Sequence, residues 1–234
     1  MKLIYLEDSY QRDFDATVQS VSGCRINLDK TAFYPQSGGQ PSDQGFLHKG
    51  EAVFNIHHVE PLNGQIAHTL NEEGALLPGD QVHGEINWER RYRFMRSHTA
   101  CHILSAVILH ETNAKITGNQ IDLERSRVDF SLESFDRSLM SEYVHIANQM
   151  IKEDKPVKIR LLPKAEAMNI PNLMRLAMEV PDRDEIRIVE IEGIDIQACG
   201  GTHVRRTGEI GGIKMIKSEN KGKSNRRIYF SLVD

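Results

Sequence analysis

Two short segments, far apart in the sequence, carry metal-binding side chains at the same four-residue step. His98-Thr-Ala-Cys-His102 lies in a stretch that we expect to be helical, and residues i and i+4 of a helix share one face. Cys199-Gly-Gly-Thr-His203 lies where a predicted strand runs into a turn, and its glycines are expected to let the backbone bring Cys199 and His203 together. Three imidazoles and one thiolate suit tetrahedral zinc. The sequence therefore predicts a fold in which a helix and a strand end meet around one metal ion.

The residues alone assign no role to this zinc site. Thr99 stands where zinc proteases of the His-Glu-x-x-His type have their general base, so that chemistry is not expected. Four protein ligands are typical of a closed structural zinc, whereas a catalytic zinc usually keeps one position open. The spacing is compatible with a structural and with a catalytic metal.

The cysteines and the apolar runs indicate in which cellular compartment the protein is expected. Cys24, Cys101 and Cys199 show no paired spacing, which argues against disulfides and for a reducing environment. No apolar run approaches the roughly 20 residues of a membrane-spanning helix, and Met1 to Asp8 lacks the layout of a signal peptide. We therefore expect a cytoplasmic protein that does not associate with membranes.

Residues 1–88 are expected to form a small β-barrel. Short runs of strand-forming residues alternate with turns rich in Gly and Pro, among them Tyr34–Gly45 and Pro61-Leu-Asn-Gly64. Many short strands joined by such turns are typical of barrels. The predicted strands lie within residues 14–22, 24–31, 53–59, 65–70 and 81–88.

Residues 89–234 are expected to form an α+β domain that binds the zinc. Arg90–His110 lacks Gly and Pro and repeats apolar residues at helical spacing. The second predicted helix has an apolar stripe from Tyr143 to Ile151, which Ser134 or Asp136 can cap. Helices and strands do not alternate strictly, so the fold class is α+β. The predicted strands cover residues 127–132, 157–162, 185–191, 212–217 and 227–233, the last two as a hairpin.

Several motifs in order resemble one family. Ser97-His-Thr-Ala-Cys-His102 and Cys199-Gly-Gly-Thr-His203 look like the paired signature of alanyl-tRNA synthetase editing domains and their freestanding AlaX-type relatives. Ala114-Lys-Ile-Thr117 and Thr207-Gly-Glu-Ile-Gly211 fall where that family has similar segments, and Gly38-Gly-Gln-Pro-Ser-Asp-Gln-Gly45 is similar to the glycine motif of the longer AlaX proteins. Related threonyl-tRNA synthetase editing domains share the ligand pattern but lack this glycine segment. The resemblance covers nearly the whole chain.

The resemblance implies an aminoacyl-tRNA deacylase with one zinc ion per chain, held by His98, His102, Cys199 and His203. The implied substrate is mischarged tRNA(Ala), chiefly the seryl ester and also the glycyl ester. Thr117 is the residue expected to recognise serine, because a site that hydrogen-bonds a hydroxyl rejects an analogue lacking it. Gln120, Gly38 and Gly39 are further expected substrate contacts. No catalytic residue is predicted beyond the metal site.

Other interpretations stay open at this point. The chain could be a non-catalytic, zinc-stabilised tRNA-binding module, an editing enzyme for another ester such as Ser-tRNA(Thr), or a metallohydrolase of small esters. Without the resemblance, Thr117 is a β-branched strand residue, Gln120 belongs to a solvated turn and the glycine segment is a plain turn.

Two basic clusters are candidate contacts to the tRNA acceptor stem. The net charge of −4 does not favour a nucleic-acid binder, and such clusters are usually solvated faces. A tRNA substrate would give them phosphates to bind, so we predict backbone contacts, salt-sensitive binding and no DNA partner. The predicted contacts are Arg90, Arg91, Arg93, Arg96, Lys221, Lys223 and Arg226, with Lys217 and Arg227 beside them.

Overall fold

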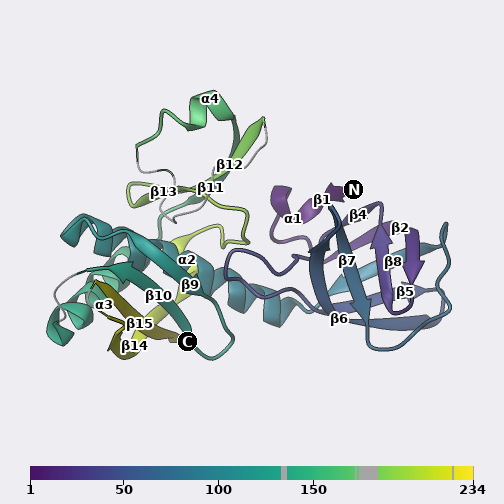
Figure 1. Cartoon of the computed structure of the whole chain (residues 1–234), viewed down its shortest axis with the longest axis horizontal. Coiled ribbons are helices and arrows are strands. Elements are labelled where there is room, and N and C mark those ends of the chain that lie inside the picture. The colour runs from purple at the N-terminus through teal and green to yellow at the C-terminus, as the bar shows by residue number, and fades with distance from the viewer. Residues whose placement is uncertain (133–135, 172, 174–183, 223, 234) are drawn as a thin grey trace. The chain divides into compact units, whose positions relative to one another are not determined.

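The computed structural model describes residues 1–132, 136–171, 173, 184–222 and 224–233 (Figure 1). Its contacts fall into two compact units, Met1–Phe94 and Met95–Asp234. The boundary predicted between a 1–88 and an 89–234 domain stays a prediction.

The first unit contains a closed six-stranded barrel, as the sequence predicts. Neighbouring barrel strands pair antiparallel, and burial alternates along them, most regularly in β8. This period of two places apolar side chains such as Val18, Leu47 and Ile56 inside the barrel, where they are at most 1% exposed. In order around the barrel the strands are β2 (Asp13–Ser22), β3 (Arg25–Leu28), β7 (Gln65–Leu70), β6 (Ala52–Leu62), β5 (Gly45–Lys49) and β8 (Gln81–Ile86).

Short elements and tight turns complete this unit. β1 (Lys2–Leu3) pairs in parallel with β4 (Lys30–Thr31), and α1 (Ile4–Glu7) follows β1. The turn between β6 and β7 is narrower than predicted, because Pro61 and Leu62 still pair with β7. Only Asn63 and Gly64 form it, with φ of 51° and 76°, as a two-residue hairpin turn requires.

The predicted strand over residues 81–88 ends two residues early. Asn87 follows β8, and its side-chain Oδ1 accepts a hydrogen bond from the backbone N–H of Arg90 at 3.1 Å. This is the role of a helix N-cap, so Trp88 opens helix α2 (Trp88–Thr112) and does not extend the strand. Most residues from Phe94 to Ile108 are buried whichever way they point, which explains why α2 is less amphipathic than a surface helix.

The second unit contains two antiparallel sheets. The four-stranded sheet has the order β14 (Gly212–Asn220), β15 (Asn225–Val233), β10 (Ser126–Ser131) and β9 (Ile116–Gln120), so the predicted C-terminal hairpin is present. The three-stranded sheet has the order β11 (Val157–Pro163), β12 (Glu185–Ile191) and β13 (Asp195–Ala198). A short helix α4 (Lys164–Ala167) follows β11, and a 3-10 helix η1 (Thr207–Ile210) precedes β14.

Helix α3 (Arg137–Lys152) covers one face of the four-stranded sheet. Its predicted stripe is buried at Tyr143, Ala147 and Ile151. The side chain of Asp136 caps it by accepting a hydrogen bond from the Ser138 N–H at 2.8 Å, whereas the other predicted cap, Ser134, lies outside the described residues. Asn148 ties α3 to the sheet through two hydrogen bonds with the backbone of Ile213.

In the part of the chain that the structure describes, no helix combines the length and the apolar character needed to cross a membrane.

Candidate metal centre

The structure brings the two predicted ligand segments together within the second unit. His98 and His102 lie one turn apart on α2, and Cys199 and His203 lie in the loop that follows β13. The four side chains each offer one ligand atom, and these atoms all lie within 4.8 Å of one another. The three imidazole rings surround one point, with centroid distances of 5.2, 4.4 and 4.6 Å.

The spacing of the donor atoms fits tetrahedral zinc. Cys199 Sγ lies 3.6 Å from His98 Nε2 and 3.4 Å from His203 Nε2. Zn–N and Zn–S bonds of about 2.05 and 2.3 Å at a tetrahedral angle place nitrogen and sulfur roughly 3.6 Å apart. These two sulfur–nitrogen separations therefore match those around one zinc ion.

Hydrogen bonds on the far side of two rings select the tautomer that a metal needs. Thr99 Oγ1 donates to the Met95 carbonyl at 2.9 Å, so at 3.1 Å from His203 Nδ1 it accepts the proton on that nitrogen. His102 Nδ1 lies 3.0 Å from the Asp195 carboxylate, which Gln197 holds at 2.7 Å. In both rings Nδ1 is used outward and Nε2 faces the cluster, an arrangement common behind metal-bound histidines.

The electrostatics favour a thiolate at Cys199. Burial opposes ionisation, but the imidazoles of His98 and His203 and a hydrogen bond from His102 hold the pKa of the Cys199 thiol well below its usual range. Burial also opposes a charge on His102, and its hydrogen bonds to Asp195 and Cys199 nevertheless raise its pKa to about 9. The buried Cys101 is the opposite case, because burial raises the pKa of its thiol and keeps it protonated. Of Cys101 on α2 and Cys199 in the loop after β13, only Cys199 has the lowered thiol pKa that favours metal binding.

The cluster opens to solvent on one side. The three histidines are buried, with exposures of 3%, 5% and 1%, whereas Cys199 is partly exposed and Gly200 is exposed. The predicted tight glycine turn is not seen at Gly200, where a Cβ would meet nothing within 4 Å and φ is not positive. The small residue instead leaves the edge of the cluster uncovered, and the N–H of Gly201 donates to Cys199 Sγ at 3.4 Å.

Comparison with known proteins places the chain among editing factors. Residues 186–229 match the family described as "Threonyl and Alanyl tRNA synthetase second additional domain", and residues 3–90 match "tRNA synthetases class II (A)". The chain is 51% identical over 99% of its length to the "Alanyl-tRNA editing protein AlaX-M" of Methanosarcina barkeri, covering 98% of that protein. It is 50% identical over its full length to the protein of the same name from Methanosarcina acetivorans, covering 99% of it. The chain belongs to the AlaX-M family.

A longer relative is also similar to this AlaX-M family member. The alanine–tRNA ligase of Pyrococcus abyssi is 34% identical over 98% of the chain, but the match spans only 26% of the ligase. The segment that contains Cys199 and His203 lies inside the match to the second additional domain, and the barrel lies inside the match to the class II model.

The substrate residues expected in this family lie outside the four-residue cluster. Thr117, on β9, is exposed, and its Oγ1 donates to Asn225 Oδ1 at 2.9 Å. Gln120, at the end of β9, is exposed and accepts a hydrogen bond from Arg127 Nε at 3.1 Å. Neither side chain bonds to a cluster residue among the described contacts, so the predicted roles of both stay predictions.

The glycine motif of this AlaX-M member forms a tight exposed turn in the first unit. Gly38 and Gly39 have φ of 56° and 82° between Ser37 and Gln40, whose backbones exchange hydrogen bonds of 3.1 and 2.9 Å. A Cβ at Gly38 would meet nothing within 4 Å, so its φ, not space, calls for glycine. The last glycine of the motif, Gly45, has a structural reason, since a Cβ there would overlap the carbonyl oxygen of Glu85.

Arg91 is the clearest correction to the predicted RNA contacts. Its guanidinium is fully buried, forms an ion pair with Asp43 of the glycine motif, and donates to the carbonyls of Ser9 and Ala32 at 2.9 and 2.6 Å. A side chain enclosed in this way is unable to reach a phosphate. The prediction for Arg91 is wrong because charge runs in sequence do not show which member turns inward.

Arg226 is a second correction. Only 3% of it is exposed, and its Nη1 donates to the side chain of Asn220 and to the carbonyls of Gly222 and Asn225. It fastens the β14–β15 loop from within, so it does not contact RNA in this conformation. Alternation along β15 turns Arg226 inward and Arg227 outward.

The other predicted RNA contacts are partly or fully exposed. Arg90 donates to the Ser42 carbonyl at 3.2 Å, and Arg96 donates to the Ile210 carbonyl through Nε and Nη2. Arg93 is partly exposed, Lys221 is exposed beside Glu219, and Lys223 lies outside the described residues. The predictions for these residues remain untested by the geometry.

Sequence reasoning missed the residues that orient the histidines. Thr99 was considered only as a missing general base, and Asp195 and Gln197 were not singled out. A signal existed for the latter pair, because positions 195 and 197 share one face of a strand that leads to Cys199. Polar residues at these alternating positions are buried in the structure, and buried polar side chains usually have a hydrogen-bond partner.

Proposed function

We propose that this protein hydrolyses the ester between a wrongly attached amino acid and the terminal ribose of tRNA(Ala), with serine as the main substrate and glycine as a second. The observation that carries the proposal is the His98, His102, Cys199 and His203 cluster, with its ligand atoms within 4.8 Å and one edge open, in a chain of the AlaX-M family. The reduced thiols fit a cytoplasmic enzyme.

In this proposal the four side chains hold one zinc ion per chain. Zinc bound there would act as a Lewis acid that polarises a carbonyl or a water molecule. Thr99 and Asp195 keep the Nε2 atoms of His203 and His102 facing inward, which orients both rings for a metal ion. The partly exposed Cys199 and the exposed Gly200 leave this edge of the cluster open to solvent, where an aminoacyl ester would approach.

Selection of serine is assigned to Thr117 in the proposal, with Gln120, Gly38 and Gly39 as further contacts to the aminoacyl end. A synthetase pocket for alanine discriminates poorly against a slightly different small side chain, so a second, hydrolytic selection improves accuracy. The acceptor stem would be held by the exposed members of the basic clusters, Arg90, Arg93, Arg96 and Lys221.

A structural role for zinc is the second candidate. Four protein ligands, three of them with under 6% exposure, are typical of a closed structural site. In that case the chain would bind tRNA without hydrolysing it, and removing zinc would unfold the second unit.

The deciding experiment measures deacylation of Ser-, Gly- and Ala-tRNA(Ala) before and after treatment with a chelator. The proposal expects fast loss of seryl ester, slower loss of glycyl ester, little loss of alanyl ester and recovery of chelated enzyme by added zinc. Cys199→Ala should abolish hydrolysis, whereas the matched control Cys24→Ala, another partly exposed cysteine, should not. Absence of hydrolysis in the zinc-loaded protein would contradict the proposal and favour the binding module.

A further inference from the structure

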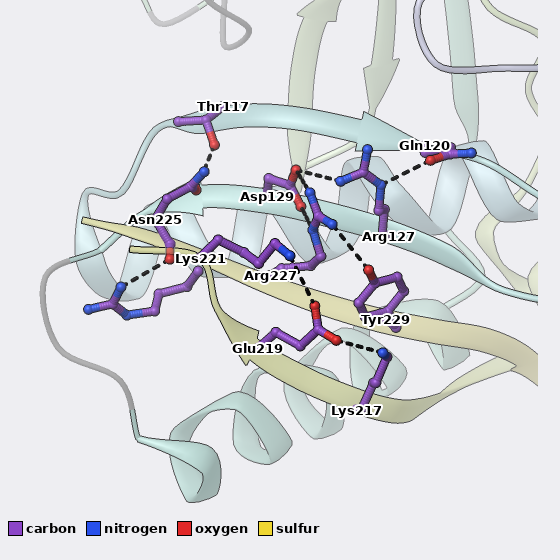
Figure 2. A network of polar contacts seen from close by, with 11 residues as sticks. Thr117, Gln120, Arg127, Asp129, Lys217, Glu219, Lys221, Asn225, Arg227 and Tyr229 are labelled. Atoms are coloured by element: carbon purple, nitrogen blue, oxygen red, sulfur yellow. Dashed lines mark hydrogen bonds and ion pairs between the residues drawn. The ribbon is translucent and has the colours of Figure 1, made fainter. Parts of the chain in front are cut away.

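One face of the four-stranded sheet is polar and is not the face that α3 covers. Alternation along β15 buries Ile228 and Phe230 on the α3 side and turns Arg227 and Tyr229 to the other side. The same alternation on β10 buries Val128 and Phe130 and directs Arg127 to this open face. Figure 2 shows the polar side chains of the open face reaching toward one another across the strands.

The strand register orders these side chains into two rows. In the first row Gln120, Arg127, Tyr229 and Lys217 lie opposite one another on four neighbouring strands. In the second row Asp129, Arg227 and Glu219 lie opposite one another in the same way. Residues paired across strands have Cβ atoms roughly 5 Å apart, so each row is a continuous strip of contacts.

Asp129 fixes the two arginines of the rows. Its carboxylate accepts from Arg227 Nε and Nη2 at 2.6 and 2.7 Å and from Arg127 Nη1 at 2.9 Å. Arg127 Nε is held by Gln120, which leaves its Nη2 without a partner among the described residues. Two guanidinium groups are thus held rigidly, one with an edge directed to solvent, and rigid guanidinium groups are the usual ligands of phosphate.

Tyr229 lies among cations at the floor of a hollow. Lys217 Nζ is 4.6 Å, Arg125 Cζ is 5.5 Å and Arg227 Cζ is 5.7 Å from the centre of its ring. The hollow has a volume of about 450 Å³, and its lining consists of Tyr229, Gln120, the three arginines 125, 127 and 227, and the two acidic residues Asp122 and Glu124. This volume is within the range of small-ligand pockets, roughly 300–1,000 Å³.

An aromatic ring with several cations around it is a combination with which proteins bind single-stranded RNA. Bases stack on aromatic faces and on guanidinium planes, and phosphates pair with the arginines. The carboxylates of Asp122 and Glu124 in the lining repel phosphates, so a long phosphate track is disfavoured. The site is therefore restricted to one or two unstacked nucleotides and does not suit a duplex.

We propose that this hollow, centred on Tyr229 and Arg127, binds an unstacked nucleotide of the single-stranded 3′ end of the tRNA. The inference rests on the proposed function and specifies how its substrate is held, at a site separate from the metal cluster. Tyr229 supplies the stacking surface, Arg125 and Arg127 contact phosphate, and Asp129 positions Arg127.

The test measures binding of a fluorescein-labelled short single-stranded RNA ending in CCA by fluorescence anisotropy over a salt series. Tyr229→Leu should weaken binding roughly 5- to 150-fold, the effect of one lost stacked base. Arg125→Gln and Arg127→Gln should weaken it and lower the salt slope by about 0.7 each. The matched control Arg160→Gln, which removes the partly exposed ion pair between Arg160 on β11 and Glu190 on β12, should change the affinity by no more than about twofold.

Three results would overturn the inference: unchanged affinity in Tyr229→Leu and Arg125→Gln, equal affinity for a duplex RNA, or displacement of the RNA by polyglutamate as readily as by unlabelled RNA. If Tyr229→Leu does not fold, Arg125→Gln still decides, because residue 125 is exposed.

Deacylation of Ser-tRNA(Ala), measured in parallel, separates this inference from the proposed function. The inference expects the variants to raise KM with little change in kcat. An active wild type whose variants keep both Kd and KM would refute the nucleotide site and leave the function standing. An inactive wild type that binds the RNA through Tyr229 would refute the function alone.

Discussion

Replacing Arg91 by Met should destabilise the barrel unit far more than any surface substitution. Arg91 is fully buried, pairs with the equally buried Asp43, and donates to the carbonyls of Ser9 and Ala32. Methionine fills a similar volume but leaves the carboxylate of Asp43 as a buried charge without its cation. Breaking a buried ion pair from one side costs about 3–5 kcal/mol. That is a large fraction of the roughly 5–15 kcal/mol that stabilises a domain.

The assay is urea unfolding followed by tryptophan fluorescence. Trp88 is the only tryptophan and lies in the barrel unit near Arg91, so its signal reports this unit. Arg160→Met is the control, because its ion pair with Glu190 is about half exposed and such pairs contribute roughly 0–1 kcal/mol. The double variant Arg91→Met, Asp43→Asn should recover part of the lost stability, since it also removes the unpaired negative charge of Asp43.

A loss in Arg91→Met no larger than in Arg160→Met would refute this reasoning. It would mean that Asp43 finds water or another donor when the guanidinium is gone, and that the glycine motif is not held by the first turn of α2.

Three further predictions concern the metal, the substrate and pH. Asp195→Asn should lower zinc affinity by about 10- to 100-fold in a chelator competition, because it weakens the hydrogen bond that orients His102; unchanged affinity would remove Asp195 from this role. Thr117→Val should reduce the preference for seryl over alanyl ester in deacylation assays. An unchanged ratio of the two deacylation rates would show that Thr117 does not select serine. Burial lowers the pKa of His68 to about 4, below its usual 6.5, so the folded barrel keeps it neutral while the unfolded chain protonates it first. The free energy of unfolding should therefore fall by about 1.6 kcal/mol from pH 6.5 to pH 5 in the wild type relative to His68→Phe, and parallel pH profiles would contradict this.

Local patterns predicted most of the elements. The alternation in residues 81–86 and the apolar stripe of α3 are short-range signals, and the structure has a strand and a helix there. The end of the strand predicted over residues 81–88 was wrong because Asn87 can end a strand or cap a helix, and only its hydrogen bond to Arg90 decides between them. The short strand β5 was not predicted because Gly45 at its start is a residue typical of turns. In the structure this glycine instead allows close packing against the backbone of Glu85.

The four members of the candidate metal-binding cluster were predictable because a helix places His98 and His102 on one face, and Cys199 and His203 repeat the same four-residue step. The supporting residues were not, since Thr99 and Asp195 act through contacts over 104 and 93 positions of sequence. The inward turn of Arg91 and Arg226 has the same cause. A charge pattern gives the number of cations in a segment, but tertiary packing decides which of them face solvent.

X-ray absorption spectroscopy at the zinc edge, on protein reconstituted with one equivalent of zinc, tests the central claim most directly. The account predicts three nitrogen neighbours at about 2.0–2.1 Å and one sulfur at about 2.3 Å, with the sulfur lost in Cys199→Ala and retained in Cys24→Ala. A spectrum without sulfur, or one that Cys199→Ala leaves unchanged, would show that these two distant segments do not share a metal ion.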